Sequence, residues 1–237
     1  MLKLKNIIIT VADKTIIKNL DLELEKNKVY VLMGPNGSGK STLALTLMGH
    51  PLYQIKSGKI FFEKKDITNL ESDKKANAGI FLSFQSPLSL SGVSAFSLLR
   101  TAIAGKKDPL VLREEIEKTA KILKIKKELL ERSFNEGTSG GEKKKLELLQ
   151  ASVLNPKFLM FDEIDTGVDV DALKTIAQFM EKNKKGKTYL LITHYNRILK
   201  YVKPDEVLVM MEGKIVKRGN YKLAEEIEKS GYSTLSG

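Results

Sequence analysis

Cysteine is absent from the 237 residues of this sequence. Its absence excludes a disulfide scaffold, a thiolate metal site and an iron–sulfur cluster ligated by this chain itself. The absence does not identify the redox compartment, because a chain without thiols suits any compartment.

Long apolar runs are also missing. No stretch approaches the roughly 20 apolar residues that a membrane-spanning helix needs. The apolar residues 7–11 near the start are soon followed by Asp13 and Lys14, which argues against a signal peptide. We therefore expect a cytoplasmic chain that does not insert into a membrane directly, and any spanning part would come from another chain.

The composition is that of a globular protein, with 42% hydrophobic and 29% charged residues. Lysine and arginine number 40 against 29 acidic residues, which gives a formal charge of +11. A basic surface can bind nucleic acid, but lysines here alternate with glutamates, as in residues 113–118 and 181–185. This alternation favours solvated helix faces over nucleic-acid binding. An acidic protein partner or a lysine-rich proteome would explain the charge equally well.

The order of apolar patterns predicts an α/β fold with a helical insert. Strand-like apolar runs lie at residues 2–11, 16–24, 59–62 (started by Ser57 and Gly58) and 79–84, and buried strands are expected at residues 29–33, 157–161, 188–193 and 206–211. Helices are expected at residues 43–48, 93–104, 109–123, 141–153 and 170–182. We interpret residues 1–237 as one unit, with residues 87–155 as a helical subdomain inserted into the α/β core.

A glycine-rich loop follows the third predicted strand and precedes a predicted helix. Residues 34–41 fit the phosphate-loop pattern G-x-x-x-x-G-K-[ST] without a mismatch. In such a loop, backbone N–H groups and the helix dipole bind phosphates, Lys40 reaches the β- and γ-phosphates, and the Ser41 hydroxyl binds Mg²⁺. A plain glycine-rich turn is the alternative, which the flanking strand and helix disfavour. The predicted nucleotide-binding residues are Gly34, Pro35, Asn36, Gly37, Ser38, Gly39, Lys40, Ser41 and Thr42.

Two adjacent carboxylates end the apolar run at residues 158–163. Asp162 stands where an acid beside a phosphate loop binds Mg²⁺ through water. The side chain of Glu163 points elsewhere because side chains alternate along a strand, and it can polarise a water for attack on the γ-phosphate. A solvated acidic strand end is common in isolation, but the upstream phosphate loop favours the catalytic interpretation.

Further polar groups lie at element ends. Gln85 and His194 each follow an apolar strand, where open α/β sheets bind ligands. The stretch Ser139-Gly140-Gly141-Glu142 precedes a predicted helix whose first turn carries three lysines, at residues 143–145. Three cations there oppose the helix dipole. Docking of an anion would explain them, although solvent exposure could make the cost negligible.

Taken together, these motifs resemble the ABC-type ATPases, in family order and over nearly the whole chain. Residues 34–42 are similar to Walker A, Gln85 to the Q-loop, residues 138–142 to the ABC signature with threonine for leucine, residues 158–163 to Walker B with its glutamate, residues 166–169 to the D-loop and His194 to the switch histidine. The resemblance implies a P-loop core with an N-terminal antiparallel β subdomain and an inserted helical subdomain.

The resemblance also implies how ATP is bound. One copy's Walker A and the other copy's signature would enclose each ATP in a transient homodimer, with Mg²⁺ on Ser41, Gln85 and Asp162. Glu163, His194 and Gln85 would be catalytic. The predicted cross-dimer residues are Ser139, Gly140, Gly141, Glu142 and Asp169. Val11 stands where family members often carry an aromatic residue for the base, which leaves base selectivity open.

Within the ABC ATPases, the chain is similar to the SufC family of iron–sulfur cluster assembly. The resemblance rests on residues 47–51, 84–87, 139–144, 162–165, 169–173 and 193–199. It implies SufB-like and SufD-like scaffold proteins as partners, and these would carry the cluster. The alternative is the ATPase subunit of an ABC membrane transporter. A chromosome or repair ATPase would need long coiled-coil arms that the insert cannot hold, and a scaffold without turnover is disfavoured by Glu163 and His194.

Overall fold

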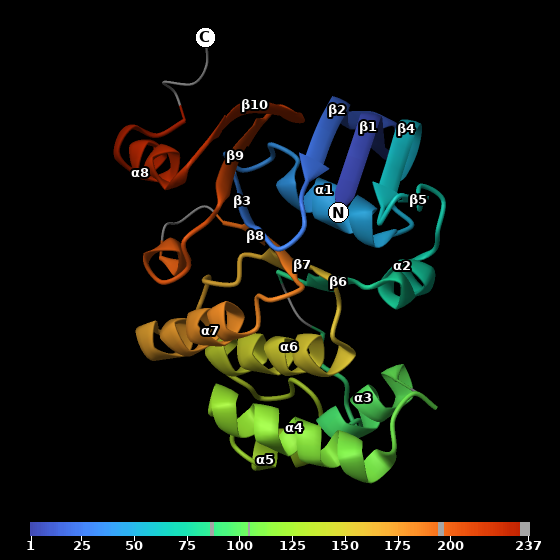
Figure 1. Ribbon diagram of the computed structural model, residues 1–237, viewed down its shortest axis with the longest axis vertical. Helices are drawn as coiled ribbons and strands as arrows, with labels where there is room; N and C mark the ends of the chain where they lie inside the picture. Colours follow the sequence, from blue (N-terminus) through green and yellow to red (C-terminus); the bar gives the residue numbers. More distant parts are fainter. Residues whose placement is uncertain (86–87, 104, 194–196, 233–237) are drawn as a thin grey trace.

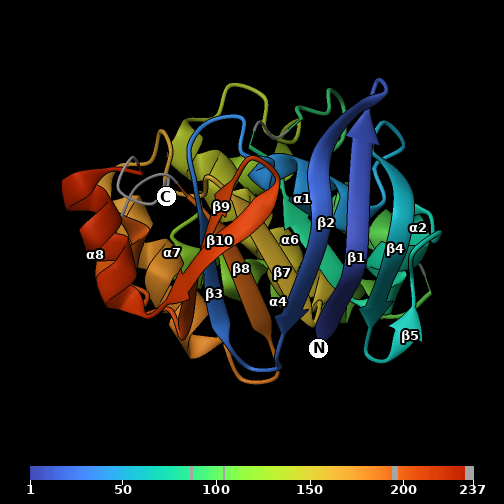
Figure 2. The ribbon, with the colours of Figure 1, turned by 90° about the horizontal axis from the view of Figure 1, so that it is seen from above.

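The computed structural model describes residues 1–85, 88–103, 105–193 and 197–232. Its strands form two sheets, one antiparallel in the order β2-β1-β4-β5 and one largely parallel in the order β10-β9-β3-β8-β7-β6. Figure 2 shows the antiparallel strands beside the parallel sheet. The strands are β1 (Leu2–Val11), β2 (Lys14–Leu24), β3 (Val29–Met33), β4 (Gln54–Phe62), β5 (Lys65–Asp66), β6 (Ile80–Ser83), β7 (Phe158–Asp162), β8 (Thr188–Ile192), β9 (Glu206–Met211) and β10 (Lys214–Gly219).

Helices cover both faces of the parallel sheet, and four of them, α3 to α6, lie together on one side in Figure 1. The helices are α1 (Lys40–Met48), α2 (Ser72–Ala78), α3 (Ala95–Ala102), α4 (Pro109–Leu123), α5 (Glu128–Glu131), α6 (Gly140–Leu154), α7 (Val170–Lys182) and α8 (Tyr221–Ser230), with a 3₁₀ turn at Ile198–Lys200. None of the helices in the described ranges is long and apolar enough to cross a membrane.

The two faces of the parallel sheet belong to two separate apolar cores. Along β3, Val31 packs into the core shared with α4, α6 and α7. Its neighbour Leu32 packs into the core shared with α1 and the antiparallel sheet. Successive side chains of a strand point to opposite faces, so the fully apolar run at residues 29–33 fills both cores at once. This explains why the phosphate-loop helix α1 and the helix α6 lie on opposite faces.

The expected α/β layout is confirmed, and the predicted bounds of α4, α7 and β9 agree with the structure. The prediction that Ser57 and Gly58 start a strand is wrong, because β4 already begins at Gln54. At Gly58 the pairing with β1 shifts register, and its φ is +91°. A Cβ there would lie 2.4 Å from the carbonyl oxygen of Lys5. Glycine at this position therefore permits a bulge of β1 opposite it, instead of marking the start of β4.

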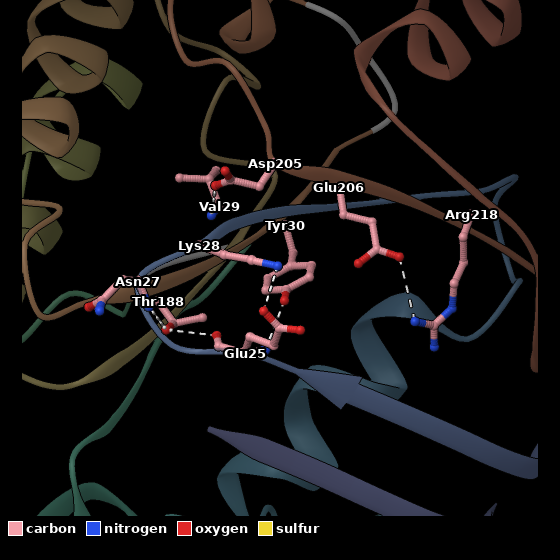
Figure 3. A network of polar contacts seen from close by, with 9 residues as sticks. All are labelled: Glu25, Asn27, Lys28, Val29, Tyr30, Thr188, Asp205, Glu206 and Arg218. Atoms are coloured by element: carbon pink, nitrogen blue, oxygen red, sulfur yellow. Dashed lines mark hydrogen bonds and ion pairs between the residues drawn. The ribbon is translucent and has the colours of Figure 1, made fainter.

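The amino-terminal ends of β3 and β8 are tied to the antiparallel sheet by a polar network (Figure 3). The Tyr30 hydroxyl accepts a hydrogen bond from the backbone N–H of Glu25 at 2.8 Å. The Thr188 hydroxyl accepts from the N–H of Asn27 at 3.0 Å and donates to the carbonyl of Glu25 at 3.2 Å. These bonds fix the turn through which the chain passes from the antiparallel into the parallel sheet.

A buried lysine closes the carboxyl end of α1. Lys75 of α2 is 1% exposed, and its Nζ donates to the carbonyl oxygen of Thr46 at 3.1 Å. A cation is favourable at a helix carboxyl end, yet burial lowers the pKa of Lys75 from 10.5 to about 8.

This lowered pKa predicts a pH-dependent stability. Between the folded pKa of about 8 and the unfolded 10.5, the unfolded chain holds a proton that the folded chain has released. Stability from this group therefore rises with pH across that window. We expect the free energy of unfolding of the wild type, measured relative to Lys75→Met by denaturant titration, to increase between about pH 8 and about pH 10.5. A difference that is flat with pH would contradict the assigned burial.

Candidate active site

The phosphate loop joins the end of β3 to the start of α1, and its first glycine cannot be replaced. Gly34 has a φ of +156°, and a Cβ on it would lie 2.1 Å from the carbonyl oxygen of Met210. Within the loop, the N–H of Ser38 donates to the carbonyl of Pro35 at 3.2 Å. The close approach to β9 and the tight turn together shape a concave backbone, as a phosphate cradle requires.

Lys40, the first residue of α1, lies across this loop. Its Nζ donates to the carbonyl oxygens of Gly34 and Pro35, at 2.8 Å each. Burial lowers the pKa of Lys40, whereas the nearby charges of Asp162 and Glu163 raise it. A cation is thus held in the loop, facing the two carboxylates predicted from the sequence.

Asp162 ends β7 beside this cation. Its side chain is buried, and burial raises its pKa, opposed by a hydrogen bond from the Ser41 hydroxyl. Within the described part of the chain, its Oδ1 is a buried atom that has no hydrogen-bond partner. A carboxylate oxygen without a partner, next to a hydroxyl, is the oxygen donor set that Mg²⁺ prefers. Ser41 and Asp162 therefore fit a magnesium site.

The structure brings two predicted catalytic residues together across 78 positions of sequence. The Nε2 of Gln85 donates to the Oε2 of Glu163 at 2.8 Å, and the Thr166 hydroxyl donates to the same oxygen at 3.3 Å. Glu163 has a φ of +53°, and its N–H donates to the carbonyl of Ile192 at 2.8 Å. This sharp turn directs Glu163 away from the strand and towards the loop that follows β6.

The signature residues form the start of α6. Ser139 caps the helix, because its hydroxyl accepts from the N–H of Glu142 at 3.3 Å while the Glu142 carboxylate accepts from the N–H of Ser139 at 2.9 Å. This capping box holds the pKa of Glu142 below its usual range, chiefly through the bond from the Ser139 backbone. The side chain of Glu142 therefore orders the first turn of α6.

The two signature glycines pack against the segment that leads into α7. A Cβ on Gly140 would lie 2.5 Å from the carbonyl oxygen of Gly167, and one on Gly141 would lie 3.5 Å from Oδ2 of Asp169. Asp169 itself caps α7, since it accepts from the N–H of Ala172 at 2.8 Å. The signature thus contacts the predicted D-loop of its own chain, whereas the phosphate-loop helix packs on the other face of the sheet.

His194 lies outside the described residues, but the nearest described residues before and after it, Thr193 and Arg197, form hydrogen bonds within the chain. The Thr193 hydroxyl donates to both carboxylate oxygens of Asp165, at 3.0 and 3.1 Å. The guanidinium of Arg197 donates to the carbonyl of Val168 at 2.8 Å and to that of Asp165 at 3.2 Å. The sequence predicted no role for these residues, although they lie in segments on which the family resemblance rests. The structure connects Thr193 and Arg197 to the segment after Glu163.

Two contacts from the carboxyl-terminal part of the chain were not predicted. The hydroxyl of Tyr232 accepts a hydrogen bond from the N–H of Gly34 at 3.0 Å. The N–H of Gly213, in the turn between β9 and β10, donates to the carbonyl of Ser38 at 2.9 Å. The α8 segment carries apolar residues Leu223 and Ile227 at helical spacing, a signal that could have found the helix but not its contact with the loop.

We expect Tyr232→Phe to weaken ATP binding. The change removes only the hydroxyl that holds the first residue of the phosphate loop, and one such hydrogen bond contributes about 1 kcal/mol. The Kd for ATP, measured by fluorescence titration, should therefore rise about 5-fold. Tyr221→Phe, the same deletion at the start of α8, should leave it unchanged. Equal affinity of Tyr232→Phe and wild type would exclude a role for this contact.

Comparison with known proteins agrees with this geometry. The chain matches the ABC transporter family over residues 17–166. It belongs to this family, in its ATPase class, and it binds and hydrolyses ATP. Among its relatives, it is 40% identical to "Probable ATP-dependent transporter SufC" of Escherichia coli (strain K12), covering 100% of this chain and 99% of that protein. It is 42% identical to "Probable ATP-dependent transporter ycf16" of Antithamnion sp., covering 100% and 98%. The chain is thus similar to SufC and ycf16 over its whole length.

Solved structures show the same fold. A nucleotide-free ATP-binding cassette from an ABC transporter superposes with a TM-score of 0.79 at 30% identity, covering 98% of this chain and 95% of that one. A dimeric cassette in a post-hydrolysis state with ADP and Pi superposes with a TM-score of 0.79 at 20% identity, covering 93% and 98%. The expected fold class, an ABC ATPase nucleotide-binding domain, is therefore confirmed.

Proposed function

We propose that this chain is the ATP-hydrolysing subunit of a Suf-type iron–sulfur cluster assembly complex in the cytoplasm. ATP closes two copies of the chain, and the closure strains SufB-like and SufD-like scaffold proteins so that their assembly site opens. The observation that carries this proposal is the 40% identity to SufC over the full length, together with a complete set of ATPase motifs. The alternative is an ATPase subunit of an ABC membrane transporter, since the relatives' names include the word transporter.

The placement of its parts supports a site that is divided between two copies. Gly140 and Gly141 pack against the start of α7, whereas α1 and the phosphate loop belong to the core on the other face of the sheet. Ser139, Gly141 and Asp169 of one copy would then complete the site around the phosphates held by residues 34–42 of the other. To convert a mostly open pair into a mostly closed one, ATP must favour the closed form by about 5.5 kcal/mol.

Within one copy, the residues have separate tasks. Lys40 binds the β- and γ-phosphates, and it exchanges its bonds to the loop carbonyls for bonds to phosphate oxygens. Ser41, Asp162 and Gln85 would hold Mg²⁺, which when bound neutralises charge on the phosphates. Glu163 polarises the attacking water as a general base. His194 contacts the γ-phosphate and the partner copy.

A mixing experiment tests the divided site. Lys40→Ala and Ser139→Arg variants, each inactive alone, would form one intact site when two different copies pair, because the Ser139→Arg copy supplies the phosphate loop and the Lys40→Ala copy supplies the signature. We expect the mixture to recover ATP hydrolysis, measured as phosphate release with scaffold present. A mixture as inactive as its components would reject the shared site.

A groove beside Gln85 is the proposed docking surface for the scaffold. It has a volume of about 840 Å³ and runs between the α2–β6 region and α3, with Phe84 and Leu88 on its wall. Phe84 is 44% and Leu88 77% exposed, and exposed apolar groups in a groove suit a protein partner. Affinity purification from the native cell identifies that partner. SufB-like proteins support the assembly function, and integral membrane proteins support the transporter alternative.

We also propose that residues 1–237 act as a single ABC ATPase domain, with residues 87–155 as an inserted helical subdomain. Helices α3, α4 and α6 share one apolar core with the parallel sheet, which supports an insert that is packed on the core and not hinged from it by a linker. Limited proteolysis should then leave the insert attached to the core in one resistant fragment.

A further inference from the structure

A buried ion pair lies on one face of α6, within about one and a half turns of the end of the signature. The Nζ of Lys144 and the Oε2 of Glu147 are 3.1 Å apart, and each side chain is only 5% exposed. Burial raises the pKa of Glu147, whereas the charge of Lys144 and hydrogen bonds from its neighbours lower it. Among the described residues, Ser83, Phe84 and Lys144 each donate to Glu147, so these contacts favour the ionised carboxylate.

The pair holds both backbone polar groups of a single residue. The carboxylate of Glu147 accepts from the N–H of Phe84 at 3.0 Å, and Lys144 donates to the carbonyl oxygen of Phe84 at 2.8 Å. The same carboxylate accepts from the hydroxyl of Ser83 at 2.6 Å. Phe84 follows the last residue of β6, which is an edge strand of the parallel sheet. Two side chains of α6 thus satisfy the backbone N–H and C=O of Phe84, as the backbone of a neighbouring strand would.

Phe84 is directly followed by Gln85, whose amide donates to Glu163 at 2.8 Å. A continuous path of short contacts therefore runs from α6 through the backbone of Phe84 to Gln85 and Glu163. The same helix begins with Ser139 and Gly140. Any movement of α6 that follows contact between the signature and a phosphate would act on Gln85 through this path.

Stability alone gives little reason for such a pair. Taking two charges out of water is costly, and replacing a buried ion pair by apolar residues of similar size is often neutral or stabilising. Polar groups that fix one geometry of a loop, however, have a use that apolar packing cannot supply. Here the geometry concerned is that of the backbone next to Gln85.

We propose that Lys144 and Glu147 are positioning residues for ATP hydrolysis, which hold the backbone of Phe84 and thereby place Gln85 against Glu163. The inference rests on the catalytic role proposed for Gln85. The inference extends the site to two side chains of α6, whose contacts reach Gln85 through the backbone of Phe84.

The main test uses a variant designed to fold. The variant combines Ser83→Ala, Lys144→Met and Glu147→Leu. It removes both charges and the hydroxyl, and it leaves an apolar contact between α6 and the end of β6. We expect the variant to stay folded, with a melting temperature below that of the wild type because the backbone of Phe84 loses two hydrogen bonds, and with an unchanged Kd for ATP. We expect kcat to fall by about 10- to 100-fold, as displacement of a catalytic group by about 1 Å can cause. Glu147→Gln, which keeps the shape and an acceptor for Phe84, should show a smaller loss.

A mutant cycle separates positioning from a general structural effect. Gln85→Ala is made alone and in the triple variant, and kcat is measured for each. If the pair acts through Gln85, the combined variant should be no slower than Gln85→Ala. A folded triple variant with wild-type kcat, or losses that multiply, would overturn the inference and leave the role of Gln85 intact. A wild-type kcat in Gln85→Ala alone would reject that role and the inference with it.

Discussion

Glu163→Gln should abolish most of the ATP hydrolysis of this protein while leaving ATP bound. The amide keeps the size of the side chain and can still meet Gln85, whose Nε2 lies 2.8 Å from the Glu163 carboxylate. It cannot accept a proton from the attacking water. Loss of a general base lowers kcat by roughly 10²- to 10⁴-fold. Phosphate release under saturating ATP measures the loss, and a binding titration shows whether the Kd is retained.

A matched control for this change is Glu114→Gln on α4, which neutralises an exposed carboxylate in the helical part of the chain. Its kcat should equal that of the wild type. Full turnover by Glu163→Gln would reject Glu163 as the general base. The variant also tests whether two copies enclose ATP between them, because trapped ATP should produce a stable dimer in light scattering when scaffold proteins are present.

Lys40→Met should instead lose ATP binding. The Nζ of Lys40 is the cation at the phosphate loop, with 2.8 Å bonds to two loop carbonyls that phosphate oxygens can replace. A hydrogen bond to a charged group contributes about 1.5–3 kcal/mol, so the Kd for ATP should rise about 10- to 100-fold. Fluorescence titration with a nucleotide analogue measures it.

The fold should tolerate this substitution. Burial already lowers the pKa of Lys40, which means that the folded state bears a cost for the ammonium that methionine does not. The melting temperature of Lys40→Met should therefore not decrease. Lys14→Met, at an exposed position of β2, serves as the control and should bind ATP normally. An unchanged Kd in Lys40→Met would contradict its placement against the phosphates.

Parts of the site that are continuous in sequence were predictable. The phosphate loop, the acid at the end of β7 and the capping box at the start of α6 each depend on residues within a few positions of one another. Their conformations are decided by glycine, by strand alternation and by side chains that bond the adjacent backbone. The strand bulge at Gly58 was misread because a glycine inside a strand looks locally like a boundary.

Edge elements were harder to find. Strand β10 pairs with a neighbour on one side only, and most of its residues are exposed. Its sequence therefore lacks the apolar alternation that marks a half-buried strand. Its turn nevertheless contacts the phosphate loop through Gly213 and Ser38, so an element with little sequence signal contributes to the site.

The sequence by itself determined that the protein is a nucleotide-binding α/β ATPase, because the phosphate loop, the strand-end carboxylates and the signature are short contiguous patterns. Only the tertiary structure decided which of these groups meet. Gln85 donates a hydrogen bond to Glu163, and the backbone of Phe84 is bonded by both Lys144 and Glu147. Tyr232 accepts a hydrogen bond from Gly34 across 198 positions of sequence. Such contacts depend on how sheet and helices pack, and no local spacing encodes them.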